Sequence, residues 1–177
     1  MNYCTTFNGP FADLLLISDG EFLCGLYMDK TDNDGSAFLA ASKKYGKLQR
    51  KDHLPVFEQT SSQLSEYFAG KRNSFDIPIK MIGSEFQKKV WQELLKIPFG
   101  CTASYGEIAA RISNPSASRA VGLANGSNPI GIIVPCHRVI GANGSLTGYA
   151  GGMDRKRFLL DHERRLKLES LATASCV

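Results

Sequence analysis

The 177-residue sequence lacks an apolar run long enough to cross a bilayer, and its five cysteines form no CxxC pair. A membrane-spanning helix needs about 20 consecutive apolar residues. The first residues, Met1–Cys4, lack the basic segment with which a signal peptide begins. Histidine is also scarce, and His53, His137 and His162 do not stand at zinc-finger spacing from the cysteines. We therefore expect an intracellular, cytoplasmic protein with free thiols, no metal and no membrane partner.

Acidic and basic residues are unevenly divided along the chain. Residues 1–79 hold 8 Lys/Arg and 10 Asp/Glu, a net charge of −2, whereas residues 80–168 hold 13 and 6, a net charge of +7. A basic half beside an acidic one indicates a polyanionic partner such as nucleic acid. The alternative is an uneven scatter of surface charge without a function.

Turn-forming residues near Gly83 divide the chain into two predicted domains and place it in the α+β class. Residues 1–82 are predicted to form an N-terminal α/β scaffold domain around an antiparallel sheet. Residues 83–168 are predicted to form a mostly helical, winged-helix-like C-terminal domain. The remaining residues, 169–177, are small and polar, which predicts a disordered tail.

The predicted sheet rests on three apolar runs, Tyr3–Phe7, Leu14–Ile17 and Phe22–Met28. Asn-Gly-Pro and Asp-Gly turns separate these runs, so an antiparallel meander is expected. A helix over 56–69 and an edge strand over 75–79 complete the domain. None of these segments carries residues with evident chemistry, so the domain is interpreted as a scaffold.

The second half opens two helices with capping boxes, in which a hydroxyl residue is followed three positions later by Glu or Gln. The boxes are Ser84–Gln87 and Ser104–Glu107. An Asn-Pro pair then starts a third helix across Ser116–Ala124. Two short helices joined by a tight turn make a helix-turn-helix. A basic helix over 153–168 is predicted to close the fold.

The chemistry of the chain is expected in the β-branched segment Ile132–Ile140, which is typical of a buried strand. Pro135 cannot donate to a ladder, so the strand should break where Cys136 emerges. A cysteine with its ordinary pKa of about 8.5 needs a base to become the reactive thiolate. Because neighbouring strand residues point to opposite faces, His137 can act as that base only through a sharp turn or a bridging water. The alternative is an inert buried thiol.

Several short motifs accompany this cysteine over residues 86–163, about half the chain. They are Arg119–Gly122, Asn128-Pro129, Pro135–Arg138, Gly148–Gly152 and His162-Glu163. Together they resemble the active-site region of the O6-alkylguanine-DNA alkyltransferases, the methylated-DNA–protein-cysteine S-methyltransferases. The resemblance implies direct-reversal repair of O6-alkylguanine in double-stranded DNA. The alkyl group would move irreversibly to Cys136, once per molecule, in a monomer without a cofactor.

The resemblance also implies catalytic roles for particular residues. Cys136 would accept the alkyl group, and His137 would take its proton through a water. Glu163 would orient the imidazole, which is the logic of a catalytic triad. Tyr105 would donate to the leaving guanine, unless it is only a core aromatic residue. Arg138 is expected to have a structural role in the surrounding loops.

The remaining implied roles concern the substrate pocket and the DNA. The residues assigned to the pocket are Asn128, Pro135, Val139, Tyr149, Ala150 and Gly151. The residues assigned to DNA binding, on or directly after the third helix, are Ser118, Arg119, Ala120 and Asn125. The helix would dock in the minor groove, and Arg119 would enter the duplex where the flipped nucleotide has left. The alternatives are that small residues pack this helix on its neighbours and that Arg119 is a solvated charge.

Two other function classes fit part of the sequence. A damage-recognising DNA-binding module without catalysis would share the helix-turn-helix, but relatives of that kind lack the cysteine. A cysteine hydrolase would share the Cys-His pair, but it would need an oxyanion hole. Some relatives have a proline where this chain has Gly131, so we expect bulkier alkyl groups or O4-alkylthymine to be accepted here.

Overall fold

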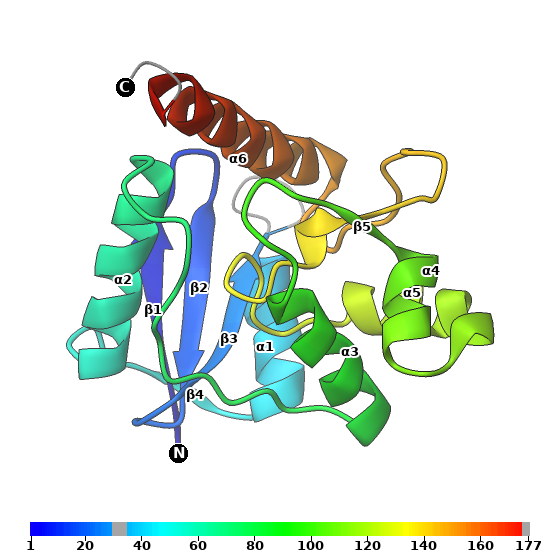
Figure 1. Ribbon diagram of the computed structural model, residues 1–177. Coiled ribbons are helices and arrows are strands. Elements are labelled where there is room, and N and C mark those ends of the chain that lie inside the picture. Colours follow the sequence, from blue (N-terminus) through cyan, green and yellow to red (C-terminus); the bar gives the residue numbers. More distant parts are fainter. Residues whose placement is uncertain (30–34, 175–177) are drawn as a thin grey trace. The chain divides into compact units, whose positions relative to one another are not determined.

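The computed structural model describes residues 1–29 and 35–174. It contains two compact units (Figure 1). The first comprises Met1–Ile82 together with Pro129–Ile133, and the second comprises Gly83–Asn128 together with Val134–Val177. Residues 129–133 therefore belong to the first unit, although the residues on both sides of them belong to the second. The predicted single boundary after residue 82 does not include this exchange.

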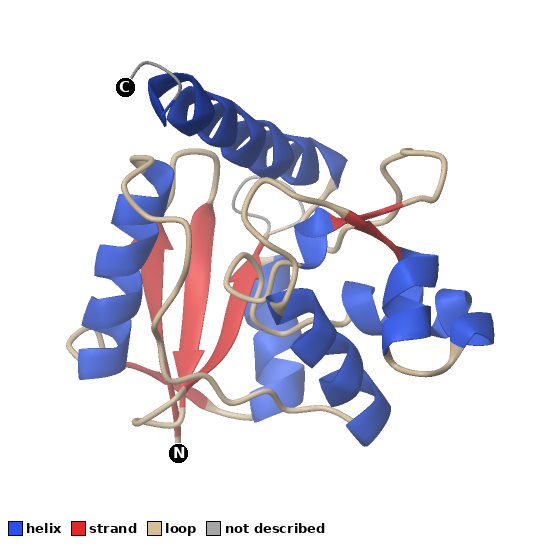
Figure 2. Cartoon of the chain, in the orientation of Figure 1, coloured by secondary structure: helices blue, strands red, loops and turns tan. Residues whose placement is uncertain are grey.

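The first unit is built on a four-stranded sheet in the order β3-β2-β1-β4 (Figure 2). Its strands are β1 Asn2–Asn8, β2 Asp13–Ser18, β3 Leu23–Met28 and β4 Leu48–Arg50. The pairs β1–β2 and β2–β3 are antiparallel, which confirms the predicted meander. The short β4 pairs with β1 in parallel. The α+β class is thus confirmed.

Two helices accompany this sheet, α1 (Ser36–Tyr45) and α2 (Pro55–Phe68). Ala41 and Tyr45 of α1 pack in one apolar cluster with Ile17 of β2 and with two buried cysteines. Because side chains alternate along a strand, Leu16 projects from the opposite face of β2, where it is also fully buried. The sheet is therefore covered on both faces, which explains why β2 is apolar at almost every position.

Two segments predicted as strands are mostly not strands. The expected edge strand over 75–79 is reduced to one bridge between Ile79 and Leu23. Of the expected strand over 132–140 only the end is a strand, β6 (Val139–Ile140), which pairs in parallel with the short β5 (Ala103–Ser104). Ile132 has φ +69°, in the left-handed region, so the backbone cannot continue as a strand.

The second unit is mostly helical. Its helices are α3 (Glu85–Leu95), α4 (Tyr105–Arg111), η1 (Pro115–Ala117), α5 (Ser118–Gly126), η2 (Cys136–Arg138) and α6 (Met153–Ala174). Both predicted capping boxes are present with reciprocal bonds, at Ser84 with Gln87 and at Ser104 with Glu107. The third predicted helix divides into a 3₁₀ turn, η1, followed by α5. Helices α4 and α5 pack together as the expected helix-turn-helix.

The last helix is longer than predicted. It continues to Ala174, so residues 169–174, predicted to be disordered, are helical. An ion pair from Arg165 to Glu169, 3.0 Å long and spaced at i,i+4, supports this extension. Within residues 1–29 and 35–174, no helix has the length and apolar character that a bilayer crossing requires.

The start of α3 provides a test of packing. Gly83 precedes the helix cap, and a Cβ there would lie 2.5 and 2.7 Å from two ring carbons of Trp91, which is fully buried. Gly83→Ala should therefore lower the free energy of unfolding by about 1–3 kcal/mol through overpacking. Gly126→Ala is the control, because its Cβ would meet no atom within 4 Å. The measurement is denaturant unfolding; equal stability of the two variants would contradict the packing argument.

Candidate active site

Cys136 lies at the start of a tight 3₁₀ turn, η2 (Cys136–Arg138), and not on a strand. The turn is closed by bonds from Arg138 N to Pro135 O, 3.0 Å, and from Val139 N to Cys136 O. Pro135 precedes the turn at φ −82° and ψ 63°, where it ends any extended backbone. The backbone therefore turns sharply after Pro135, and the path of the proton from Cys136 to His137 stays a prediction.

His137 is completely buried and is paired with Glu163 of α6. Its Nε2 lies 2.8 Å from Glu163 Oε1, and the two side chains are 0% and 1% exposed. Its other ring nitrogen, Nδ1, is buried and makes no hydrogen bond within the described residues. Because Nε2 is engaged by the carboxylate, Nδ1 is the nitrogen left to receive a proton.

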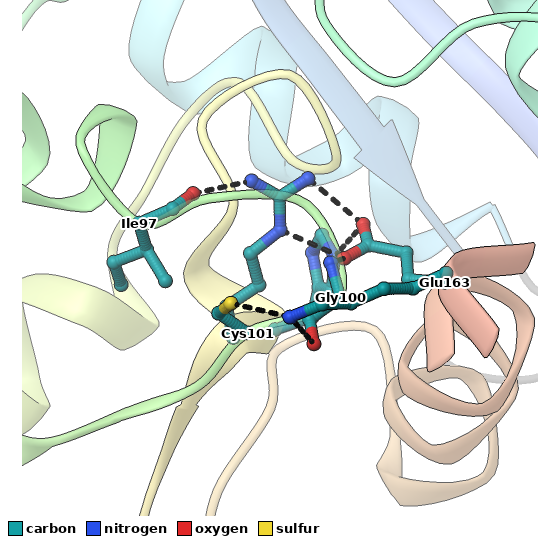
Figure 3. A network of polar contacts seen from close by, with 7 residues as sticks. Ile97, Gly100, Cys101 and Glu163 are labelled. Carbon is teal, nitrogen blue, oxygen red and sulfur yellow. Dashed lines mark hydrogen bonds and ion pairs between the residues drawn. The ribbon is translucent and has the colours of Figure 1, made fainter. Parts of the chain in front are cut away.

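The Glu163 carboxylate is held from several sides (Figure 3). Arg138 forms a fork on it, with Nε 2.9 Å from Oε2 and Nη2 2.9 Å from Oε1. Arg138 Nη1 also donates to the carbonyl of Ile97 at 2.6 Å. The backbone N–H of Gly100 donates to Oε2 at 3.0 Å. With the contact to His137, the carboxylate has four polar partner atoms in all. Such a bidentate pairing is the strong geometry for an arginine and a carboxylate.

The protonation states follow from burial and from these partners. Burial would raise the pKa of Glu163, but the hydrogen bonds and charges of His137 and Arg138 outweigh it and hold that pKa well below its usual range. Burial lowers the pKa of His137 despite the neighbouring carboxylate. Burial also raises the pKa of Cys136, although Asn128 and Lys156 act against it. The resting site therefore holds a thiol, a neutral imidazole and a carboxylate.

Two asparagines support the backbone around the cysteine. Asn128 Nδ2 donates to the carbonyl of Val134 at 2.8 Å, which ties the end of the α5 region to the reactive segment. Asn125 Nδ2 donates to the carbonyl of Cys136 at 3.2 Å, and Asn125 is only 2% exposed. The assignment of Asn125 to DNA binding is thus corrected. It lies six residues after Arg119, on a different side of the helix, and faces the interior.

Lys156 is a site residue that sequence reasoning missed. The sequence predicts only a basic helix over 153–168, whereas Lys156 of that helix is fully buried. Its Nζ donates to the carbonyl of Val139 at 2.6 Å and to that of Thr147 at 2.8 Å. Burial lowers the pKa of Lys156, and the nearby Cys136 acts in the opposite direction. The only signal in the sequence is its place between apolar helix positions, which does not distinguish it from its charged neighbours.

Two tyrosine hydroxyls lie at the loop over 146–152, one from the start of α4 and one from the loop itself. Tyr105 donates to the carbonyl of Thr147 at 3.4 Å and accepts from the Thr147 hydroxyl at 3.2 Å. The Tyr149 hydroxyl is buried and lies near the Cys136 side chain. Burial and the nearby Cys136 raise its pKa well above the ordinary value, so it remains a neutral donor. In the same loop Ala150 is exposed and Gly151 is buried.

The N-terminal part of α5 presents the other predicted DNA-contacting residues. Arg119 and Ala120 are exposed, and Ser118 is half-buried. Pro135 and Val139, assigned to the pocket, are buried in the reactive segment. Gly131 belongs to the first unit, and its effect on alkyl-group size stays a prediction. Among the described residues, no three His, Cys, Asp or Glu side chains are grouped to hold a metal.

The buried carboxylate provides a second test. Glu163→Gln should lower the free energy of unfolding by on the order of 3 kcal/mol, because it leaves the buried Arg138 guanidinium without its counter-charge. Glu169→Gln, on the same helix but in an exposed pair, should cost less than about 1 kcal/mol. Denaturant titrations of the three proteins at neutral pH provide the measurement. Similar losses for both variants would contradict the proposed importance of the buried network.

The same comparison should depend on pH. The folded-state pKa of Glu163 lies below its unfolded-state value of about 4.3, so its stabilising contribution is complete above that value. The contribution is lost as the pH falls toward the folded-state pKa. The stability gap between the native protein and Glu163→Gln should therefore be largest near pH 7 and narrow below about pH 4. A gap that widens on acidification would contradict this assignment.

Comparison with known proteins matches each half of the chain to a domain of one protein family. Residues 2–81 match the family model described as the ribonuclease-like domain of 6-O-methylguanine DNA methyltransferase. Residues 85–165 match its DNA-binding domain. Methylated-DNA–protein-cysteine methyltransferase of Methanosarcina acetivorans is 48% identical over 165 residues, which cover 91% of this chain and 97% of that protein. The Mycobacterium leprae protein of the same name is 46% identical, covering 97% and 98%.

Solved structures show the same fold. The crystal structure of Mycobacterium tuberculosis OGT in complex with DNA matches with a TM-score of 0.81 and 44% identity, covering 93% of this chain and 94% of that one. The crystal structure of M. tuberculosis O6-methylguanine methyltransferase matches with a TM-score of 0.79 and 45% identity, with the same coverage. These similarities span both units. The chain belongs to the methylated-DNA–protein-cysteine methyltransferase family.

Proposed function

We propose that the protein repairs O6-alkylguanine in double-stranded DNA by transferring the alkyl group to the sulfur of Cys136. The observation that carries this proposal is the buried series of Cys136, His137 and Glu163, with the carboxylate 2.8 Å from the imidazole. A buried thiol paired with a base and an orienting carboxylate is the arrangement that activates a nucleophile. The DNA-binding domain to which residues 85–165 match supports the choice of DNA as partner.

In the first step the Cys136 proton moves toward His137 Nδ1, and the thiolate forms beside the substrate. The imidazolium that results is stabilised by Glu163, whose negative charge Arg138 keeps in place. The sulfur then attacks the alkyl carbon, so that an S–C bond forms and the C–O6 bond breaks. The guanine leaves with the electron pair and is protonated. The transfer is a substitution that needs neither an oxidant nor a reductant, so the reaction needs no cofactor.

The leaving guanine gains negative charge, which hydrogen-bond donors can stabilise. The Tyr149 hydroxyl is a suitable donor because it is neutral, buried and close to Cys136. Tyr105 is a second donor, although its hydroxyl is bonded to Thr147 in this state. Lys156 already donates to the carbonyl of Val139, which leaves one lone pair of that carbonyl for the base.

The product is a thioether, which ordinary acid-base side chains do not cleave, so each molecule acts once. The whole set of proposed catalytic residues comes from one unit of one chain, so a monomer suffices. Such a protein acts where it meets chromosomal DNA, in the cytoplasm of a cell without a nucleus. Acceptance of larger adducts or of O4-alkylthymine is a further part of the proposal, for which Gly131 is the motivation.

Reaching O6 requires the nucleotide to leave the duplex. Flipping costs a few kcal/mol, and less for a weakened base pair such as an alkylated one. Arg119 and Ala120 are exposed near the start of α5, where a long cationic side chain stands beside a small one. The small residue allows the helix to approach the groove, and the guanidinium can fill the space left in the base stack.

The transfer itself is tested with a duplex that carries labelled O6-methylguanine. One equivalent of label should move to the peptide that contains Cys136, and none should move in Cys136→Ser. Binding of the duplex by Cys136→Ser should persist, because that change leaves α5 untouched. Label that remains on DNA, or that is released as a free product with turnover, would contradict the proposal. Binding without any transfer would favour a damage-recognising module.

The role of Arg119 is tested by Arg119→Ala. Single-turnover repair of duplex substrate should slow roughly tenfold or more, since a loss of about 1.4 kcal/mol from the flipped state is a factor of ten. Reaction with the free base O6-benzylguanine should be unchanged, because no flipping is needed. Arg111→Ala, an exposed arginine on α4, is the matched control and should alter repair far less. Equal slowing on the free base would place Arg119 in the reactive site instead.

A further inference from the structure

A second thiol of the C-terminal unit lies against a lysine. Cys101 is on the loop between α3 and α4, and Lys167 of α6 places its Nζ 2.9 Å from the Cys101 sulfur (Figure 3). The same Nζ lies 3.4 Å from the carbonyl of Gly100. Of the four cysteines that the structure describes, Cys101 is half-buried and the other three are buried. Cys101 is thus a partly accessible sulfur in direct contact with a cation.

This pair is linked to the proposed catalytic carboxylate through one residue. The N–H of Gly100 donates to Glu163 Oε2 at 3.0 Å, and Cys101 follows Gly100 directly. Gly100 has φ +65°, and a Cβ there would lie 2.8 Å from Lys167 Cδ and 3.1 Å from the carbonyl oxygen of Glu163. The loop therefore packs closely on α6 at the turn that carries both Lys167 and Glu163. Little room exists for the loop and the lysine to move independently.

We propose that Cys101 is an oxidation site, converted by hydroperoxide to a sulfenic acid, and that this change slows alkyl transfer by disturbing the bond from Gly100 to Glu163. Only the second half of this statement rests on the proposed function. The chemistry at Cys101 requires neither DNA nor Cys136.

The oxidation step balances with one peroxide molecule. The Cys101 sulfur attacks one peroxide oxygen, an S–O bond forms, and the O–O bond breaks. The leaving hydroxide takes up the thiol proton and becomes water, so the sulfur loses two electrons and the peroxide gains them. The Lys167 ammonium, 2.9 Å from the sulfur, lies where it can stabilise the negative charge that develops on the leaving oxygen as the O–O bond breaks. An added dithiol reduces the sulfenic acid back to the thiol.

The consequence for the active site follows from the lack of room around the Cys101 sulfur. The new oxygen must be placed where sulfur and nitrogen are already 2.9 Å apart, so Lys167 or the loop has to move. Either movement acts on Gly100, which touches the Lys167 side chain and holds Glu163. Cys136 is expected to react with peroxide more slowly, because it is 6% exposed and burial raises its pKa. Cys4 and Cys24 are buried with raised pKa values as well.

The oxidation is tested on the full chain with hydrogen peroxide and dimedone, which traps sulfenic acids. Peptide mapping separates Cys101 from Cys176, which lies outside the described residues. Cys101 should be labelled at least about tenfold faster than Cys136, and Lys167→Met should slow labelling of Cys101 several-fold. No labelling of Cys101, labelling no faster than that of Cys136, or an unchanged rate in Lys167→Met would overturn the oxidation site.

The coupling is tested by two readouts after brief peroxide treatment. In the native protein, transfer from an O6-methylguanine duplex should slow several-fold and the melting temperature should fall, and dithiothreitol should restore both. Cys101→Ser at the same peroxide dose should change in neither. Labelled Cys101 with unchanged rate and melting temperature would overturn the coupling. If untreated protein transferred no methyl group, the proposed function would fail, while labelling and melting would still decide this inference.

Discussion

The buried carboxylate of Glu163 is the interaction on which the C-terminal unit depends. A lone carboxylate in this interior would be strongly unfavourable. Here it accepts two bonds from Arg138, one from the backbone of Gly100, and the contact with His137. These partners come from two separate stretches of the chain, the loop at Gly100 and the turn at His137 and Arg138, whereas Glu163 itself is on α6. The same set of bonds that makes the charge tolerable therefore also assembles the loops around the reactive cysteine.

The electrostatics of the site favour reaction only when substrate is in place. Burial disfavours both a resting thiolate at Cys136 and a resting imidazolium at His137. A proton shared between them creates the two charges together, next to a carboxylate and the cationic Lys156. A thiol that is neutral at rest is protected from stray electrophiles, which suits a residue that reacts once. Cys101, in contrast, is only half-buried, and it contacts the same helix that supplies Glu163.

Local signals in the sequence predicted local features well. Both capping boxes, the antiparallel meander and the helix-turn-helix depend on residues close together in the chain, and all are present. The segment 132–140 was misjudged because β-branched residues favour a strand by propensity, whereas a positive φ at Ile132 and the turn after Pro135 prevail. The roles of Lys156 and Asn125 could not be predicted from the sequence. Whether a polar helix residue is buried depends on which other elements pack against that side of the helix.

The sequence by itself determined the capped helices, the antiparallel meander, the motif around Cys136 and the family of the chain, since these depend on short motifs and on nearest neighbours. Only the tertiary structure decided which charges are buried. It places Glu163 against His137 and Arg138 across a separation of about 25 residues, and it draws Lys156 onto two carbonyls. Long-range contacts of this kind are set by how helices and loops pack, because the cost of burying a charge is met only by partners brought from elsewhere in the chain.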